Sequence, residues 1–323
     1  MTYFAVTDKT IYNPAMKIDF AVGGQAVIEG VMMRSPHFYT VAVRDEEGKI
    51  KMKQAKFTSL TERFRILKLP LLRGIVHLVE SMSIGFKSLN YSNDVFLGED
   101  EKEEVKHGMA KTFLFAAFSA LYLIGTLAFT LFLLKVLPLW IAEKASELWP
   151  FVAEHYVLFN LIDGASKIVI FLSYIILISL LKDIRRVFQY HGAEHKSIWA
   201  YEKGLELNVE NARKQTRFHP RCGTSFIFIV ILMSIFIYTA FPPADTFLLK
   251  LGQRLAVIPL IAGISYEALK FSAKHQKNIL VRAFSAPGLM IQGLTTREPD
   301  DEQLEIALHS LKESLKVEKD LVL

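Results

Sequence analysis

The sequence predicts a mainly α-helical, polytopic membrane protein with about four transmembrane helices, preceded by a small β-containing element. Of its 323 residues, 51% are hydrophobic, and these gather in long blocks between about positions 112 and 266. Several blocks approach the roughly 20 apolar residues that a helix needs to span a bilayer. The net charge is +5, and the basic residues crowd the loops and ends beside the blocks. That distribution is typical of membrane orientation rather than of nucleic-acid binding.

Four blocks pass the length test for a membrane-spanning helix. They cover about residues 112–141, 157–181, 225–241 and 246–266. The first contains Lys135, and the second contains Asp163 and Lys167 near its start. The fourth contains Lys250 and Arg254, so its composition is the least typical of a span.

The loops between the blocks predict the orientation of the chain. Residues 182–224 are rich in Lys and Arg, whereas the connection 142–156 is mainly acidic. Because loops rich in Lys and Arg stay in the cytoplasm, we expect 182–224 and both termini to be cytosolic. The expected location is a cytoplasmic (inner) membrane. The expected partners are the bilayer and its anionic lipid headgroups, with no nucleic acid; the sequence leaves the oligomeric state open.

Composition divides the chain into four parts. These are a cytosolic β-containing N-terminal element (1–67), an amphipathic or interfacial helix with an acidic linker (68–110), a transmembrane bundle with the cytosolic loop 182–224 (111–266), and a cytosolic C-terminal tail (267–323). In the first part, alternating side chains at 38–43 and 49–53 flank a turn and predict a β-hairpin. Gly23 and Gly24 suit a tight turn or a close approach of two backbones.

A histidine pair follows the second apolar block. His191 and His195 are four residues apart, so on a helix they share one face, and Glu194 borders that face. The pattern H-x-x-E-H is the inverted form of the zincin motif. Two imidazoles one turn apart can bind one metal ion, and a neighbouring carboxylate can act as general base. We therefore expect a Zn²⁺ site here, with Glu194 as the candidate catalytic residue.

Two further ligand candidates precede the third block. His219 and Cys222 lie at the other end of the loop 182–224, so the two blocks that flank this loop would bring both pairs to one level. Imidazole and thiolate are both zinc ligands, and the expected set is therefore His191, His195, His219 and Cys222. The alternative is that Glu267 completes a His₂Glu set.

Other polar residues are expected around the ligands. Glu202, Glu29 and Gln25 are candidates for supporting the ligands by hydrogen bonds. Four arginines can contact anionic lipid headgroups or a phosphate-bearing substrate; they are Arg185, Arg186, Arg217 and Arg221.

Four blocks of sequence resemble one family. They run from Gly23 to Arg34, from Tyr190 to Lys196, from His219 to Phe226 and from Pro287 to Pro299. In this order they resemble the YqhQ-like bacterial polytopic membrane proteins of unknown function, over roughly residues 20–300. Such proteins are often described as predicted metal-dependent enzymes, so the resemblance implies the membrane architecture and a metal.

Three functional hypotheses remain open at this point. The first is a metal-dependent hydrolase that acts on a membrane-associated peptide or lipid. The second is a non-enzymatic membrane scaffold or protein-biogenesis factor with a structural metal, because four protein ligands would leave no open position for a substrate. The third is a protein that binds or translocates lipid phosphate without a metal.

Overall fold

A computed structural model describes residues 22–98, 121–122, 124–241, 244–275 and 277–322 of the protein. The chain divides into two compact units, each described by itself below. The sheet unit consists of Met1–Asp100, Ile175–Ile229 and Ala262–Leu323. The span unit consists of Glu101–Tyr174 and Val230–Ile261.

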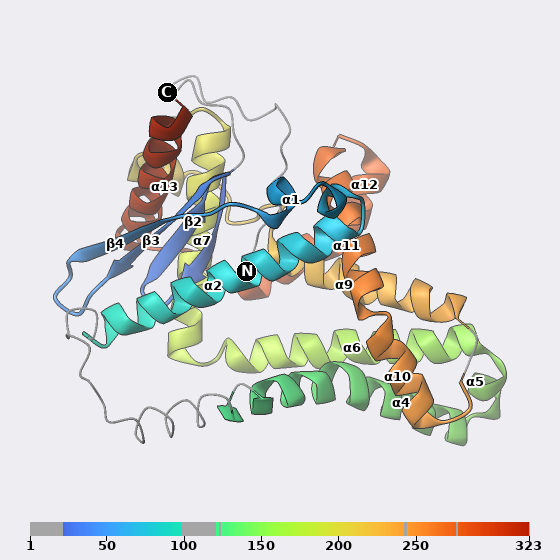
Figure 1. Ribbon diagram of the computed structural model, residues 1–323. Coiled ribbons are helices and arrows are strands. Elements are labelled where there is room, and N and C mark those ends of the chain that lie inside the picture. The colour runs from blue at the N-terminus through green and yellow to red at the C-terminus, as the bar shows by residue number, and fades with distance from the viewer. Residues whose placement is uncertain (1–21, 99–120, 123, 242–243, 276, 323) are drawn as a thin grey trace, which may run out of the picture. The chain divides into compact units, whose positions relative to one another are not determined.

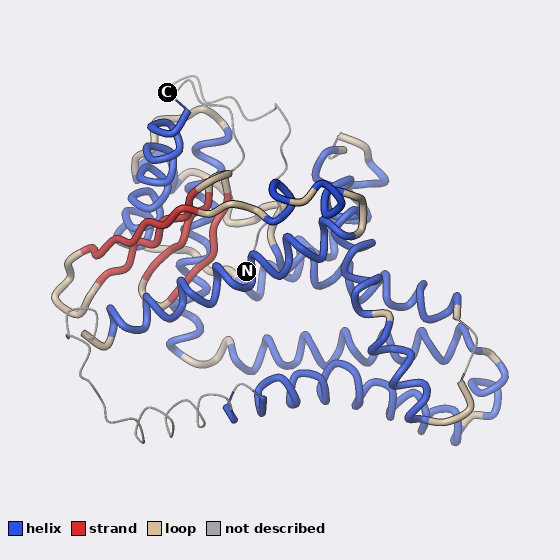
Figure 2. Tube along the Cα trace, in the orientation of Figure 1, coloured by secondary structure: helices blue, strands red, loops and turns tan. Residues whose placement is uncertain are grey.

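The sheet unit contains a four-stranded antiparallel meander (Figure 2). Its strands are paired in chain order: β1 (Gly23–Val27), β2 (Gly30–Arg34), β3 (Phe38–Arg44) and β4 (Ile50–Lys56). The predicted hairpin is confirmed as β3 and β4, whose register pairs Val41 with Lys53. The glycine-punctuated run before it forms the first hairpin, in which Glu29 adopts a positive φ of 48° at the turn.

Helices cover both faces of this sheet (Figure 1). One face packs against α7 (Lys182–Glu202) and α13 (Asp301–Val322), while the other packs against α2 (Leu72–Phe96). Because successive side chains of a strand point to opposite faces, Val31 joins the core beneath α7 and α13, and Met32 joins the core beneath α2. Both residues are at most 2% exposed. The amphipathic segment predicted at 68–92 is therefore a helix, but its buried side consists of small and polar residues together with Ile84 and Val95. Its large apolar residues Val79, Met82 and Phe86 are exposed.

The remaining elements of the sheet unit are short or lie near its C-terminal part. They are α1 (Leu60–Arg63), η1 (Arg65–Lys68), α8 (Val209–Arg213), the later turns of α11 (Ile258–Lys274), and α12 (Ile279–Thr295). The start of α2 contacts α11 closely, since a Cβ at Gly74 would lie 2.7 Å from Cβ of Tyr266. Pro287 stands inside α12.

Apolar helices confirm the membrane architecture. In the described part of the chain, three helices are long and apolar enough to cross a membrane: Ile124–Leu148, α6 (Tyr156–Ile178) and α9 (Gly223–Ala240). The helices α10 (Phe247–Ala256) and α11 are apolar enough to form a fourth span together, but they are bent by 45° where they meet. The described residues therefore form three candidate spans, or four if this bent pair counts as one. The first helix contains one π-helical turn, η2 (Phe132–Val136), followed by α4 (Leu137–Leu148), and α5 (Pro150–Glu154) comes next.

Two boundaries differ from the prediction. The first span was expected at 112–141; its helix continues to Leu148, and 112–120 together with the acidic linker at 99–110 lie outside the described residues. Near the C-terminal end of this helix, the carboxylate of Glu143 is paired with Lys250, which donates a hydrogen bond to it at 2.7 Å. The block at 246–266 is interrupted after Ala256, because Pro259 lacks the N–H group that would continue the helix.

Candidate metal centre

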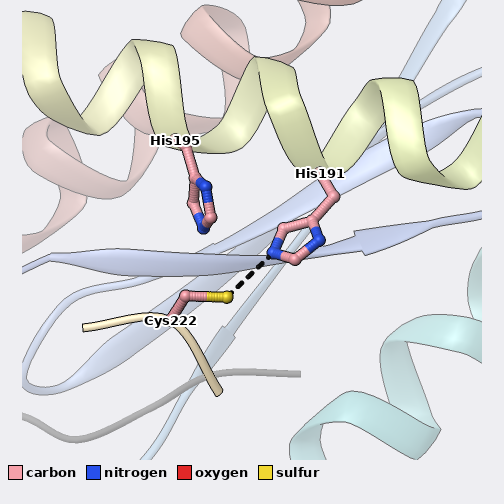
Figure 3. A group of neighbouring side chains, drawn as sticks. All are labelled: His191, His195 and Cys222. Carbon is pink, nitrogen blue, oxygen red and sulfur yellow. Dashed lines mark hydrogen bonds between the residues drawn. The ribbon is translucent and has the colours of Figure 1, made fainter. Parts of the chain in front are cut away.

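Helix α7 places two imidazoles opposite the only cysteine (Figure 3). His191 and His195 leave the same face of the helix and point toward Cys222, which precedes the first residue of α9. One ligand atom from each of the three residues lies within 4.8 Å of the others. The sulfur of Cys222 is 3.2 Å from Nε2 of His191. All three side chains are buried, so the group lies inside the sheet unit.

Backbone carbonyls orient both rings. Nδ1–H of His191 donates to the carbonyl oxygen of Thr295 at 2.8 Å, and Nδ1–H of His195 donates to that of Arg217 at 2.6 Å. These bonds fix the tautomer in which Nε2 carries the free lone pair, as is usual for a histidine that binds metal. Nε2 of His195 is buried and has no hydrogen-bond partner among the described residues. The donor set therefore fits a metal ion of the zinc type.

The local electrostatics favour the thiolate. Burial opposes ionisation of Cys222, but the adjacent His191 and His195 outweigh it and hold the pKa of the thiol well below its usual value. Burial lowers the pKa of His195, but Cys222, Glu194 and the hydrogen bond to the carbonyl of Arg217 outweigh burial, so the pKa is raised on balance. A thiolate is the form of cysteine that binds metal.

A buried glutamine positions the loop that carries Cys222. The side chain of Gln292, on α12, accepts a hydrogen bond from the backbone N–H of His219 at 2.8 Å. Its Nε2 donates to the carbonyl oxygen of His219 at 2.8 Å and to the hydroxyl of Ser225 at 3.1 Å. Gly288, one turn earlier on α12, allows this approach, because a Cβ there would lie 2.9 Å from Cβ of Ser225. The loop is thus held at both ends.

Glu194 lies beside the group with one oxygen occupied. Its Oε1 accepts a hydrogen bond from the backbone N–H of Gly24 at 2.9 Å. Its Oε2 is buried and has no hydrogen-bond partner in the part of the chain that the structure describes. The close backbone approach expected at the glycine pair is present here, since a Cβ on Gly24 would lie 2.7 Å from Cγ of Glu194. A buried carboxylate oxygen of this kind is available for a proton, a water molecule or a metal.

His219 lies next to the group but makes other contacts. Its ring centroid is 5.6 Å from that of His195. Its Nδ1 accepts a hydrogen bond from the backbone N–H of Arg221 at 3.3 Å, and its Nε2 lies 3.4 Å from a carboxylate oxygen of Glu202. Burial and the neighbouring His195 lower the pKa of His219 to about 3, so this imidazole is neutral at physiological pH. Three of the four expected ligands come together. The fourth, His219, lies beside His195, but its two ring nitrogens interact with Glu202 and Arg221.

The other predicted carboxylates have basic partners. Glu267, the alternative ligand, forms an ion pair with Arg73, whose Nε donates at 2.7 Å. Glu202 is paired with Arg221 as well as lying near His219. Of these two, only Glu202 contacts one of the expected metal ligands.

The glycine-flanked hairpin holds the last two predicted residues. Glu29 forms an ion pair with Arg186 on α7, with Nη2 donating at 2.6 Å, and accepts a hydrogen bond from Tyr190 at 3.2 Å. Burial and Glu29 raise the pKa of Tyr190. Gln25 points to the opposite face of the sheet, where its side-chain oxygen lies against Gly85 of α2. Neither residue forms a hydrogen bond to His191, His195 or Cys222 in the described part of the chain, but Glu29 holds the N-terminal half of α7 through Arg186 and Tyr190.

Three of the four arginines that were expected to contact lipid headgroups or phosphate have partners within the protein. Besides the pairs of Arg186 with Glu29 and Arg221 with Glu202, Arg217 donates to the hydroxyl of Thr296 at 2.9 Å. The side chain of Arg185 is exposed.

Several residues that build the site had no role in the sequence analysis. Thr295 and Gln292 belong to the block from Pro287 to Pro299, which was noted only for its resemblance. Gly192 is required by packing, because a Cβ there would collide with the carbonyl oxygen of Arg297. Thr295 acts through its backbone carbonyl, Gly192 through a close contact, and Gln292 through side-chain hydrogen bonds to the distant loop 219–225, and none of these belongs to a metal-ligand motif. The signal that could have identified them is the density of Gly, Gln and Thr in that block.

The fold and the site define a class of protein: a multi-pass membrane protein with a buried His–His–Cys group that can hold a metal ion. The chain belongs to the DUF1385 family, described as "Protein of unknown function", whose family model matches residues 69–317. It is 36% identical over 305 residues to "Uncharacterized protein YqhQ" of Bacillus subtilis (strain 168), covering 94% of each chain. No solved structure matches.

Proposed function

We propose that this chain is a metal-dependent hydrolase of the bacterial inner membrane. His191, His195 and Cys222 would hold one zinc-type ion. The observation that carries the proposal is the tautomer of the two histidines, whose Nδ1–H groups are both taken up by backbone carbonyls. Their Nε2 lone pairs are therefore left for a shared ligand beside a low-pKa thiol.

Three protein ligands favour catalysis over a closed structural site. Structural zinc sites have four protein ligands, whereas catalytic sites keep a position open for water or substrate. Because His219 uses its nitrogens for Arg221 and Glu202, it does not fill that position in this arrangement. When bound, the ion supplies Lewis acidity toward a carbonyl or phosphoryl oxygen.

Glu194 is the proposed general base. The Gly24 N–H holds its Oε1, so the carboxylate cannot rotate freely, and Oε2 remains available to accept a proton from the attacking water. At the end of the reaction the same oxygen can return that proton to the leaving group. Gly24 thus acts as a positioning residue for the base.

The proposed substrate is a membrane-associated peptide, or an ester or phosphoester of a lipid. Support comes from the chain positions of the ligands: α7 begins shortly after the apolar helix α6, and Cys222 directly precedes the apolar helix α9. The basic character of 182–224 supports a cytosolic location for this site.

A structural metal is the second candidate, and burial favours it. The exposed fractions of His191, His195 and Cys222 are 7%, 1% and 1%. A metal here would join α7, the start of α9 and, through Thr295, the end of α12. In this alternative the protein would be a membrane scaffold or biogenesis factor.

Metal analysis of the purified full-length protein tests both candidates. We expect about one equivalent of zinc per wild-type chain, and loss of most of it in His191→Ala and Cys222→Ser. Glu194→Gln is the matched variant, because it keeps the side-chain shape and removes only the basic oxygen. Wild-type protein without stoichiometric metal would contradict the proposal.

Function separates the two candidates. We expect Glu194→Gln to keep its zinc and to lose cellular function in a strain that lacks the native copy, together with any hydrolysis of ester or phosphodiester probes in detergent micelles. Full function of Glu194→Gln would favour the structural metal.

A further inference from the structure

The span unit contains a cluster of Lys, Arg and Asp side chains, whereas the metal centre consists of His and Cys. Lys135, Lys167 and Arg254 gather around one carboxylate, that of Asp163. Asp163 is 0% exposed, and Lys167 and Arg254 are each 3% exposed. All of these residues lie on helices that qualify as membrane spans or as half of the bent pair. Ionisable residues inside a span are costly and usually functional.

Direct contacts hold the cluster together. Asp163 accepts a hydrogen bond from Lys167 and forms an ion pair with Arg254. A second guanidinium nitrogen of Arg254 donates to the side-chain oxygen of Asn160 at 3.0 Å. Asn160, like Asp163, is 0% exposed. Three elements of the chain, α6, α10 and the helix of Lys135, thus contribute to one polar interior.

Tyr238 of α9 lies at the centre of the three cations. Its hydroxyl accepts a hydrogen bond from Nζ of Lys135 at 3.1 Å. The face of its ring lies 4.9 Å from Nζ of Lys167 and 4.7 Å from the guanidinium carbon of Arg254. The electron-rich ring face partly compensates positive charge, but it carries no formal negative charge.

The cluster is unbalanced in charge. Three cationic groups face one carboxylate, which leaves an excess of two positive charges when both lysines are protonated. The nearest further ion pair, Lys250 with Glu143 at 2.7 Å, is neutral as a pair. Among the described residues, no carboxylate other than Asp163 forms an ion pair with Lys135, Lys167 or Arg254. Excess charge inside a protein is strongly unfavourable, so the cluster favours the binding of an anion.

Two backbone irregularities coincide with the cluster. Lys135 lies in the π-helical turn Phe132–Val136, and such turns are frequent at functional sites. Arg254 lies in the last turn of α10, just before the 45° bend to α11. Broken membrane helices form ligand sites in transporters, because the interruption leaves polar backbone groups within the bilayer. Neither feature depends on the count of charges.

A small cavity reaches the same side chains. Its polar lining comes from Tyr156, Tyr238, Lys250, Gln253 and Arg254. Arg254 and Tyr238 therefore belong both to the ion cluster and to the lining of a space that is large enough for about one water molecule. A ligand oxygen can approach the cluster from this side.

We infer that these residues form a binding site for an oxyanion of the phosphate class within the membrane-spanning part of the chain. Guanidinium, ammonium and phenol groups are the donors that phosphate oxygens prefer, and together they supply several charge-assisted hydrogen bonds. The oxyanion would be either the headgroup of an anionic lipid or free phosphate. This site shares no residue with the metal centre, so a test of one site does not decide the other.

Binding to the purified full-length protein tests the inference with two probes. The first is inorganic phosphate, titrated into protein in a neutral detergent. The second is the lipid retained after reconstitution in nanodiscs that contain phosphatidylglycerol or only phosphatidylcholine. Saturable binding of phosphate would identify the free anion, and stoichiometric retention of phosphatidylglycerol alone would identify the lipid headgroup. Either result supports the site, and absence of both would overturn it.

Lys135→Met is the informative variant, because it removes one of the excess charges and leaves the ion pair of Asp163 with Lys167 and Arg254 intact. We expect binding to weaken about tenfold or more, the effect of losing a hydrogen bond to a charged group. Lys144→Met on the same helix is the matched control: Lys144 pairs with Glu147 at 2.6 Å, and both are exposed. Equal weakening by the two variants would overturn the inference.

Two further variants guard against a folding defect. Lys135→Arg keeps the charge and should bind within about threefold of wild type. Tyr238→Phe keeps the ring but removes the hydroxyl that accepts from Lys135, and it should bind several-fold more weakly. Wild-type binding by Tyr238→Phe and Lys135→Met together would contradict the site, and their elution as monodisperse protein verifies that they are folded.

Discussion

The backbone N–H of Gly24 donates to Oε1 of Glu194 at 2.9 Å, which joins the first strand of the sheet to the helix that carries both candidate metal histidines. This contact needs the absence of a side chain at position 24. A Cβ there would lie 2.6 Å from the carbonyl oxygen of Met32 and 2.7 Å from Cγ of Glu194.

Gly24→Ala should therefore both destabilise the sheet unit and displace Glu194. Overpacking of this kind costs about 1–3 kcal/mol, measurable as a lower midpoint of thermal unfolding in detergent. Gly293→Ala is the control, because that helical glycine has no atom within 4 Å of a built Cβ. It should be neutral or slightly stabilising, and a Gly24→Ala protein as stable as wild type would refute the close approach.

Metal removal should lower the stability of the wild-type protein. Any ligand that binds only the folded state stabilises it in proportion to the logarithm of its concentration over Kd. A chelator should reduce the unfolding midpoint of wild type and restore it after zinc is added back. Cys222→Ser should show a low midpoint that neither treatment changes. A wild-type midpoint that is indifferent to the chelator would argue against the site.

The single cysteine gives a direct readout of the bound state. Cys222 is 1% exposed and its pKa is held well below the usual value, so its accessibility rather than its ionisation should limit alkylation. We expect N-ethylmaleimide to modify the metal-loaded protein slowly and the chelated protein much faster. Mass spectrometry of the intact chain counts the adduct without ambiguity, because the sequence holds 1 cysteine. Equal rates with and without metal would contradict ligation by Cys222.

Glu80 of α2 should make stability depend on pH in the acid range. Burial opposes ionisation of this carboxylate, but hydrogen bonds from His77, from the N–H of Leu60 at 2.6 Å and from Ser59 at 3.0 Å outweigh it and lower the pKa. A lowered folded-state pKa stabilises the fold above the unfolded value of about 4.3. That contribution is lost as the pH falls through the lower, folded-state pKa.

The matched variant for this prediction is Glu80→Gln. We expect it to unfold with about 1–3 kcal/mol less free energy than wild type at neutral pH. The difference should shrink as the pH is lowered below about 4. Urea titrations at several pH values measure it, and a difference that stays constant from neutral to acid pH would show that the charge of Glu80 is not responsible.

The sequence was sufficient for those parts of the molecule that depend on local pattern. Hydropathy located the apolar helices, and alternation located the hairpin of β3 and β4, because both signals follow from residues near one another in the chain. Likewise, the spacing of His191 and His195 places two imidazoles on one helical face whatever surrounds them.

Long-range contacts were beyond such patterns. The sequence of α2 predicts an amphipathic helix, but not that Ile84 and Val95 meet the core around Met32 while Val79, Met82 and Phe86 stay exposed. His219 has the right chemistry for a ligand, yet its nitrogens are engaged by Glu202 and Arg221. The carbonyl groups of Thr295 and Arg217 orient the two metal histidines, and a backbone carbonyl leaves no trace in residue type.

X-ray absorption at the zinc edge of the purified, full-length protein tests the central claim most directly. Ligation by His191, His195 and Cys222 predicts one sulfur scatterer at about 2.3 Å, two imidazole nitrogens at about 2.0–2.1 Å and one further light atom in the open position. The sulfur contribution should vanish in Cys222→Ser. A zinc spectrum with no sulfur scatterer in the wild-type protein would contradict the assigned metal centre.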